Sequence, residues 1–134
     1  TSKASKQIDY LVIGGANPAE IMTTYTEITG RAPVLPAWAA GFWQSNLRYE
    51  TQDELLSVAR EYHRREIPVS LIVIDFFHWT QQGEWKFNQD QWPDPKAMVD
   101  ELNNLGIRTM VSVWPTVDTR SENFNVLRCN SSWG

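Results

Sequence analysis

The sequence has little cysteine, no cluster of basic residues and no long apolar run. Its one cysteine, Cys129, excludes an internal disulfide and a thiolate metal cluster within this chain. No stretch approaches the roughly 18 consecutive apolar residues of a membrane span, and the first ten residues lack the apolar core of a signal peptide. The formal charge of −4 argues against nucleic acid or an anionic membrane as a partner. The compartment stays open.

The motifs of several enzyme classes are also missing. Neither GxGxxG nor GxxxxGK[ST] occurs, which disfavours a nucleotide-binding sheet. HExxH, paired His and Cys ligands and GxSxG are absent as well. We therefore expect no metal and no cofactor. His78 stands in a long loop, where a lone histidine is more often a satisfied structural residue than a ligand.

Aromatic residues are abundant instead. The 134 residues include seven Trp, five Phe and four Tyr. Tryptophan is favoured where an apolar ring face needs cover and an N–H needs a partner. Sugars offer both, because their C–H faces stack on rings while their hydroxyls form hydrogen bonds. A large core offers them too, so composition leaves a sugar site and a core about equally favoured.

The first part of the chain predicts a strand, a helix and a second strand. Ile8–Gly15 alternates and ends in paired glycines, as a strand before a turn does. Asn17 is a suitable N-cap for a helix that Gly30 would end. After a proline-containing linker, Ala37–Gln44 is predicted to be a buried strand, although Ala-rich runs are ambiguous between strand and helix.

The remaining elements alternate between helix and strand. Thr51 with Glu54 predicts a capped amphipathic helix over residues 52 to 66, and Asp94 and Gly106 delimit a second one. Two apolar runs, Val69–Phe77 and Ile107–Trp114, are typical of strands buried on both faces, as in parallel sheets.

This order predicts the βαβ repeat of an α/β protein. A barrel or a doubly wound sheet would fit, and the missing phosphate loops favour the barrel. A complete (β/α)8 TIM barrel needs about 250 residues, so only about its first three strands can be present here.

Functional groups of such barrels gather at the carboxyl ends of the strands. Asp75 interrupts an apolar strand where the chain should emerge, and a charge there needs a partner. The partner is either a sugar hydroxyl or, alternatively, a structural arginine or backbone N–H. Trp114 ends the next strand, and we favour a pocket role for it over plain core.

The loop between Asp75 and the next helix is long and rich in rings. Trp79, nearest the strand end, is the better pocket candidate, whereas Trp85, Phe87 and Trp92 are expected to form a satellite core. The first strand end offers Gln44, Asn46, Arg48 and Tyr49, which either bind a sugar or hydrate the rim. Arg48 would equally suit Asp75 as a partner.

Five stretches, in order, resemble glycoside hydrolase family 31, the α-glucosidases and α-xylosidases. They are PAWAAGFWQSNLRY (36–49), PVSLIVIDFFHW (68–79), GEWKFNQDQWPDP (83–95), GIRTMVSVWPTVD (106–118) and RSENF (120–124). The forms IDFFHW and WKF…WPDP look closest to the α-xylosidase-like branch. A relative of the α-galactosidases fits the aromatic pattern less well. The resemblance implies domain limits at 1–35, the junction with an amino-terminal β-sandwich; 36–124, the amino-terminal part of the barrel; and 125–134, a divergent tail without the expected helix and strand.

The resemblance also implies roles. Asp75 and Trp114 would line the subsite of the sugar being cleaved, with Phe76 and Phe77 as walls and Arg48 in a less securely aligned stretch. The substrate would be an α-linked oligosaccharide or glycoside, and the two catalytic carboxyl groups of the retaining mechanism are expected beyond residue 134. We therefore expect this chain alone to be inactive and aggregation-prone. The alternative is a non-catalytic sugar-binding or structural remnant, and oligomerisation of a longer protein is left open.

Overall fold

Three short parallel strands form the sheet at the centre of the fold. The structure is a computed structural model that describes residues 7–130. In it β1 (Trp43–Asn46) pairs with β2 (Leu71–Ile74), which pairs with β3 (Arg108–Val111). The strand order follows the sequence, with every pair parallel. This is the arrangement expected of consecutive strands of a (β/α)8 barrel.

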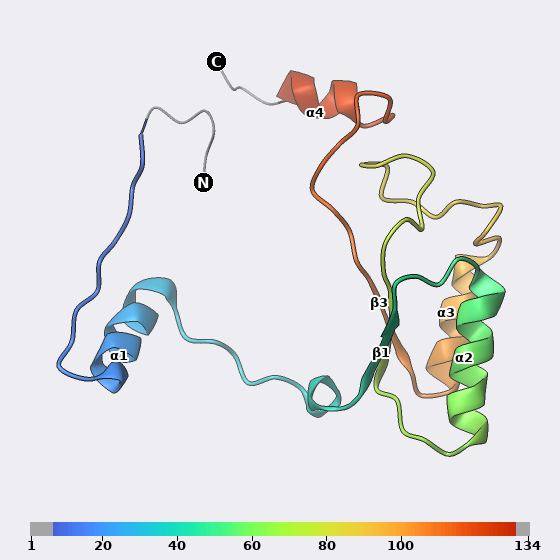
Figure 1. The fold of residues 1–134 in the computed structure, drawn as a ribbon, viewed down its shortest axis with the longest axis horizontal. Coiled ribbons are helices and arrows are strands. Elements are labelled where there is room, and N and C mark those ends of the chain that lie inside the picture. Colours follow the sequence, from blue (N-terminus) through green and yellow to red (C-terminus); the bar gives the residue numbers. More distant parts are fainter. Residues whose placement is uncertain (1–6, 131–134) are drawn as a thin grey trace. The chain divides into compact units, whose positions relative to one another are not determined.

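Two helices connect the strands and lie together on one side of the sheet (Figure 1). The first, α2 (Gln52–Arg64), is capped by Thr51, whose Oγ1 accepts a hydrogen bond from the Glu54 N–H at 3.2 Å. The second, α3 (Pro95–Asn104), is capped by Asp94 in the same way. Both predicted helix starts are confirmed.

The hydrophobic core lies between the sheet and these two helices. Its buried side chains are Tyr49, Leu55, Leu56, Ala59, Ile72, Ile74, Trp92, Met98, Leu102 and Ile107. All four residues of β2 are buried, as the predicted parallel strand requires. The flanking strands are more exposed: Trp43 of β1 and Met110 of β3 both remain open to solvent. Among the described residues from 35 onward, α2 and α3 cover one face of the sheet.

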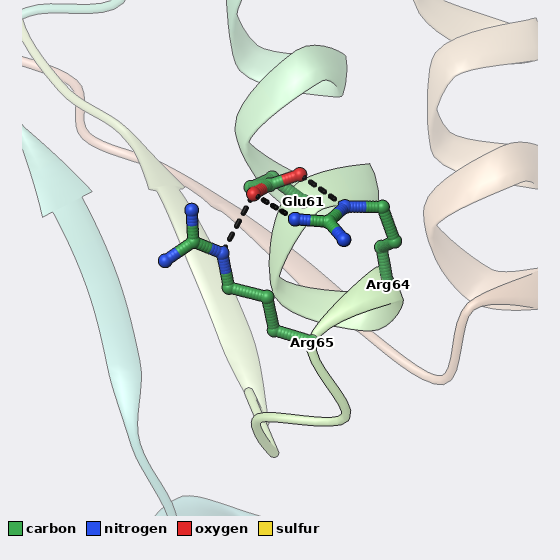
Figure 2. Close-up of polar contacts among 3 residues, drawn as sticks. All are labelled: Glu61, Arg64 and Arg65. Carbon is green, nitrogen blue, oxygen red and sulfur yellow. Dashed lines mark hydrogen bonds and ion pairs between the residues drawn. The ribbon is translucent and has the colours of Figure 1, made fainter.

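The solvent-exposed side chains near the end of α2 form a small ion-pair network (Figure 2). Glu61 Oε1 lies 2.6 Å from both Arg64 Nη2 and Arg65 Nε. The hydrogen bonds from Arg64 and Arg65 lower the pKa of the Glu61 carboxyl from 4.5 to about 2.

Residues up to Val34 form a separate compact unit that contains α1 (Pro18–Thr29). Asn17 accepts a hydrogen bond from the Glu20 N–H, and Gly30 ends the helix with φ of 86°, as predicted. The strand predicted at Ile8–Gly15 is wrong, because these residues adopt no regular structure. A strand needs a neighbour for its N–H and C=O groups, and none of the residues described pairs with this segment. The β-sandwich junction stays a prediction.

The predicted strand at Ala37–Gln44 is also wrong in its first half. Ala37–Ala40 forms a single 3-10 turn, η1, and the strand starts only at Trp43. Alanine favours helical backbone, which explains the difference. Between them Gly41 lets the chain approach the next strand, because a Cβ at this position would lie 1.8 Å from Ser70 Oγ.

A fourth helix, α4 (Phe124–Asn130), follows β3 at some distance in the chain. The tail from residue 125 on was expected to diverge from the helix and strand pattern of the family; its residues as far as 130 are helical, and the divergence stays a prediction. Ser121 explains the helix start, because its backbone C=O accepts from the Phe124 N–H and its Oγ from the Asn123 N–H. The last residues of the predicted tail, 131–134, lie outside the described residues. No helix in the described part of the chain is long and apolar enough to cross a membrane.

Candidate functional site

The carboxyl ends of β2 and β3 meet at the same end of the sheet. β2 stops at Ile74, and the ladder continues one step further through the Ser112 N–H, which donates to the Ile74 carbonyl at 2.9 Å. Asp75 is the next residue after β2, and Trp114 follows β3 closely. Figure 1 shows the chain after β2 and the chain after β3 leaving the sheet at this common end. The predicted proximity of these segments is therefore present.

Asp75 is partly exposed and unpaired in the described structure. Its carboxylate has no hydrogen bond and no ion pair with any residue between 7 and 130. The alternative that a structural arginine or a backbone N–H satisfies it is therefore wrong for this part of the chain. A carboxylate offers about four acceptor sites, so Asp75 keeps its full capacity for donors from a ligand.

Phe76 and Phe77, which directly follow Asp75 in the chain, form an aromatic cluster with Trp114. The Phe76 ring centroid is 4.1 Å from that of Phe77 and 5.2 Å from that of Trp114. Phe77 is 40% exposed and Trp114 41%, so both keep part of a ring open. We call these three residues the rim cluster. It supplies the apolar ring surface that suits the C–H face of a sugar.

The backbone of Phe76 and Phe77 is left-handed, with φ of 59° and 51°. Bulky residues rarely adopt this conformation, and two in succession are rarer still. Such strain persists only where the surroundings hold it, and it concentrates at functional sites. No sequence signal predicts this turn, because neither residue is Gly, Asn or Asp.

Trp79 lies beneath the rim cluster instead of at the surface. It is only 5% exposed, and its ring meets Phe77 edge-on at 5.7 Å. Its indole Nε1 is buried without a hydrogen-bond partner in the described structure. The role of Trp79 as a sugar-binding residue stays a prediction. What is observed is that its ring packs against the ring of Phe77.

Of the three loop rings that were predicted to form a satellite core, two do so and Trp85 does not. Trp92 is fully buried in the core, and Phe87 packs against it, as expected of a satellite core. Trp85 is not core: it is 44% exposed, and its Nε1 donates to the Trp114 backbone carbonyl at 2.9 Å. Sequence reasoning missed this contact because no spacing rule links a loop residue to the end of the next strand.

His78 belongs to the buried interior of the same loop. Its ring packs between Trp79 and Phe87, at centroid distances of 4.7 and 5.0 Å. Burial lowers the pKa of the imidazole, which therefore stays neutral near pH 7. His78 Nδ1 has no hydrogen-bond partner in the described structure, so the expectation of a satisfied histidine is wrong for this atom.

Arg48 lies near the cluster but does not pair with Asp75. Its Nη1 donates to the Phe77 carbonyl at 3.4 Å, and its Nη2 lies 3.9 Å from Glu50. Arg48 thus touches the backbone of the rim cluster, which keeps it among the predicted binding residues.

The other polar residues at the end of β1 are engaged within the protein. Gln44 donates to the Tyr49 hydroxyl at 3.0 Å and accepts from the Tyr62 hydroxyl at 2.8 Å. Tyr49 is buried, and this burial raises the pKa of its phenol. Asn46 donates to the Arg48 carbonyl. Gln44 and Tyr49 therefore link the strand to α2 and are not available at the rim.

Besides Asp75, which follows β2, a second carboxylate, Asp118, lies in the chain after β3. The side chain of Arg120 hydrogen-bonds to it at 3.0 Å and lowers its pKa from 3.8 to about 2. An anion so firmly held is a poor proton donor near neutral pH. Within the described residues there is no group of three His, Cys, Asp or Glu side chains that would hold a metal ion.

Comparison with known proteins matches this geometry. The family model described as the TIM-barrel domain of glycosyl hydrolases family 31 matches residues 32–132. A family 31 glucosidase from Pseudescherichia vulneris is 53% identical over 124 residues, which is 92% of this chain and 23% of the relative. An α-xylosidase from Saccharolobus solfataricus is 42% identical over 91% of this chain and 17% of its own. The chain thus spans about a fifth of the length of these curated relatives.

Solved structures agree with the sequence matches. A family 31 α-xylosidase from a soil metagenome, crystallised with xylose, superposes with a TM-score of 0.80 at 60% identity, over 85% of this chain and 17% of that one. A xylosidase from Aspergillus niger superposes with a TM-score of 0.73 at 44% identity, over 76% of this chain and 14% of that one. The three-stranded sheet is accordingly part of a TIM barrel, and this chain belongs to glycosyl hydrolase family 31.

Proposed function

We propose that this chain forms the amino-terminal part of the catalytic barrel of a retaining glycosidase that acts on α-xylosides or α-glucosides. The observation that carries the proposal is the unpaired Asp75 carboxylate, which the chain follows directly with Phe76 and Phe77 of the partly exposed rim cluster. Sugar hydroxyls would donate to the carboxylate, while the C–H face of the sugar would lie on a ring. The names of the relatives support both substrate classes.

Asp75 has a binding role in this proposal. Retaining glycosidases use two carboxyl groups about 5 to 5.5 Å apart, one as nucleophile and one as acid and base. We propose that both come from later strands of a longer protein. Asp75 would hold sugar hydroxyls, through hydrogen bonds that strengthen as the oxocarbenium-like transition state forms. Phe77 and Trp114 would provide ring surface, Phe76 and Trp79 would support them, and Arg48 would border the site.

A hybrid enzyme tests this role. Residues 35–124 replace the corresponding segment of the soil-metagenome α-xylosidase, and hydrolysis of p-nitrophenyl α-xyloside and α-glucoside is measured. We expect an active hybrid in which Asp75→Asn lowers kcat/KM roughly 10- to 100-fold, because a hydrogen bond to a charged group is worth about 1.5–3 kcal/mol. Asp100→Asn is the matched control, since Asp100 lies on α3 and pairs only with Lys96 among the described residues.

Two results would contradict the proposal. One is a folded but inactive hybrid, which would favour the non-catalytic remnant. The other is a hybrid in which Asp75→Asn and Asp100→Asn have the same activity. The purified 134-residue chain should show no hydrolysis, and measurable turnover by it would contradict its proposed dependence on later strands.

A further inference from the structure

We infer that Trp85 is a positioning residue that fixes Trp114 at the rim through its indole N–H. This inference deepens the proposed function and rests on it for the role of Trp114. Trp85 and Trp114 lie in separate loops, and the 2.9 Å hydrogen bond from Trp85 Nε1 to the Trp114 carbonyl joins them directly.

Trp114 needs such a partner because no regular structure holds it. β3 stops at Val111, and the chain has neither helix nor strand from there until α4 begins at Phe124. Pro115, the next residue, has no backbone N–H to donate. Trp114 is also 41% exposed, so packing alone does not immobilise it.

Four further contacts join the same two segments. The Asp118 N–H donates to the Gln82 carbonyl at 3.0 Å, and Asn123 Nδ2 donates to the Gly83 carbonyl at 2.8 Å. Lys86 Nζ lies 2.7 Å from Glu122 Oε2. The Gln82 side chain also donates to the Thr116 hydroxyl. We call these contacts, together with the Trp85 hydrogen bond, the clasp.

Gly83 shows how closely the two segments approach. Its φ is 91°, and a Cβ built on it would lie 2.7 Å from Val117 Cγ1 and 2.8 Å from Val117 Cα. A side chain there would therefore meet backbone, which cannot move aside cheaply. The clasp requires glycine at this position for both space and conformation.

Trp85 contributes its N–H and not its ring. No ring pair joins Trp85 to the rim cluster among the aromatic contacts of the described residues. Its backbone is left-handed, with φ of 50°, a conformation that persists only when the surroundings determine it. In this backbone conformation the Trp85 side chain makes its hydrogen bond to Trp114.

Trp85→Phe in the hybrid enzyme tests the inference, because it removes the N–H and keeps a ring. The matched control is Trp43→Phe, which alters an exposed tryptophan at the amino end of β1. We expect KM to rise about fivefold with kcat nearly unchanged, the factor for a loss of about 1 kcal/mol of binding. Trp43→Phe should change neither constant. A purely structural role would instead lower the thermal midpoint and leave KM unchanged.

Hydrogen exchange gives a readout that does not depend on turnover. Amides of residues 113–124 should exchange faster in Trp85→Phe than in the parent, and faster still in Gly83→Ala, which forces the clasp apart. Equal exchange in the parent and both variants would overturn the inference. If the parent hybrid has no activity, the proposed function fails, while the exchange experiment still decides whether Trp85 fixes the segment that carries Trp114.

Discussion

At the amino end of the sheet the chain enters β2 and β3 from two helix ends, whereas at the carboxyl end it leaves β2 through two phenylalanines. Both ends use left-handed backbone. Glu66 and Gly106 follow α2 and α3 with φ of 56° and 76°, and Phe76 and Phe77 follow β2. The two ends differ in the structural role of these left-handed residues.

The amino end repeats one structural solution twice. Ile67 N–H donates to the Tyr62 carbonyl and Ile107 N–H to the Leu102 carbonyl, both across five residues. This is the Schellman ending of a helix, in which a left-handed residue lets the chain turn back. At the carboxyl end, the left-handed residues Phe76 and Phe77 follow a strand and not a helix. They bring aromatic rings together directly after Asp75 in the chain. In barrels generally, the amino-terminal end of the strands serves stability and the functional groups gather at the carboxyl ends. We propose the same division for this sheet.

The largest expected effect on stability comes from removing the buried Trp92 side chain from the core. Trp92 is fully buried between the loop and the core. Trp92→Ala should lower the free energy of unfolding by about 3–5 kcal/mol, because it leaves a large cavity. Denaturant unfolding of the hybrid enzyme measures this. Trp92→Phe should cost much less, since the indole N–H has no partner in the described structure. Equal losses in both variants would contradict the cavity explanation.

Gly106→Ala tests the amino end. A Cβ at Gly106 would meet nothing within 4 Å, so the only penalty is the left-handed backbone. We expect a loss of roughly 1 kcal/mol in the free energy of unfolding. The enzyme kinetics of the hybrid should not change. A change in KM would contradict the division between a structural end and a binding end.

Glu66→Gly is the opposite experiment at the matching position. Glycine removes the strain of a left-handed glutamate, so the free energy of unfolding should rise by roughly 0.5–1 kcal/mol. Glu66→Ala keeps the strain and is the control. If both variants gain equally, the carboxylate and not the backbone was responsible.

The smallest expected effect concerns the ion pairs on α2. Glu61 has a folded pKa of about 2, below the usual 4.5. Its contribution to stability is therefore complete above about pH 4.5 and is lost as the pH falls from there toward 2. Glu61→Gln should flatten the acid dependence of stability in this window, and added salt should do the same to the parent. An unchanged pH profile would contradict the assigned pKa.

The elements on the helix side of the sheet could be predicted from the sequence because they follow local rules. Thr51 and Asp94 predict the starts of α2 and α3, and a continuous apolar run predicts β2. Ile8–Gly15 shows the limit of such rules, since it has a strand pattern but no pairing strand between residues 7 and 130, and it stays irregular. Asp75 and Trp114 could be selected from their places at strand ends. The left-handed pair Phe76 and Phe77 and the contact of Trp85 could not, because they depend on which loops meet in space.

The buried core has one more consequence, for the order of assembly. Every member of the buried cluster lies between Tyr49 and Ile107. Chains emerging from the ribosome fold from the amino end. A nascent chain that has released Ile107 already holds this whole cluster, before Trp114 has followed. During synthesis, β1, α2, β2 and α3 therefore precede the segment that carries Trp114.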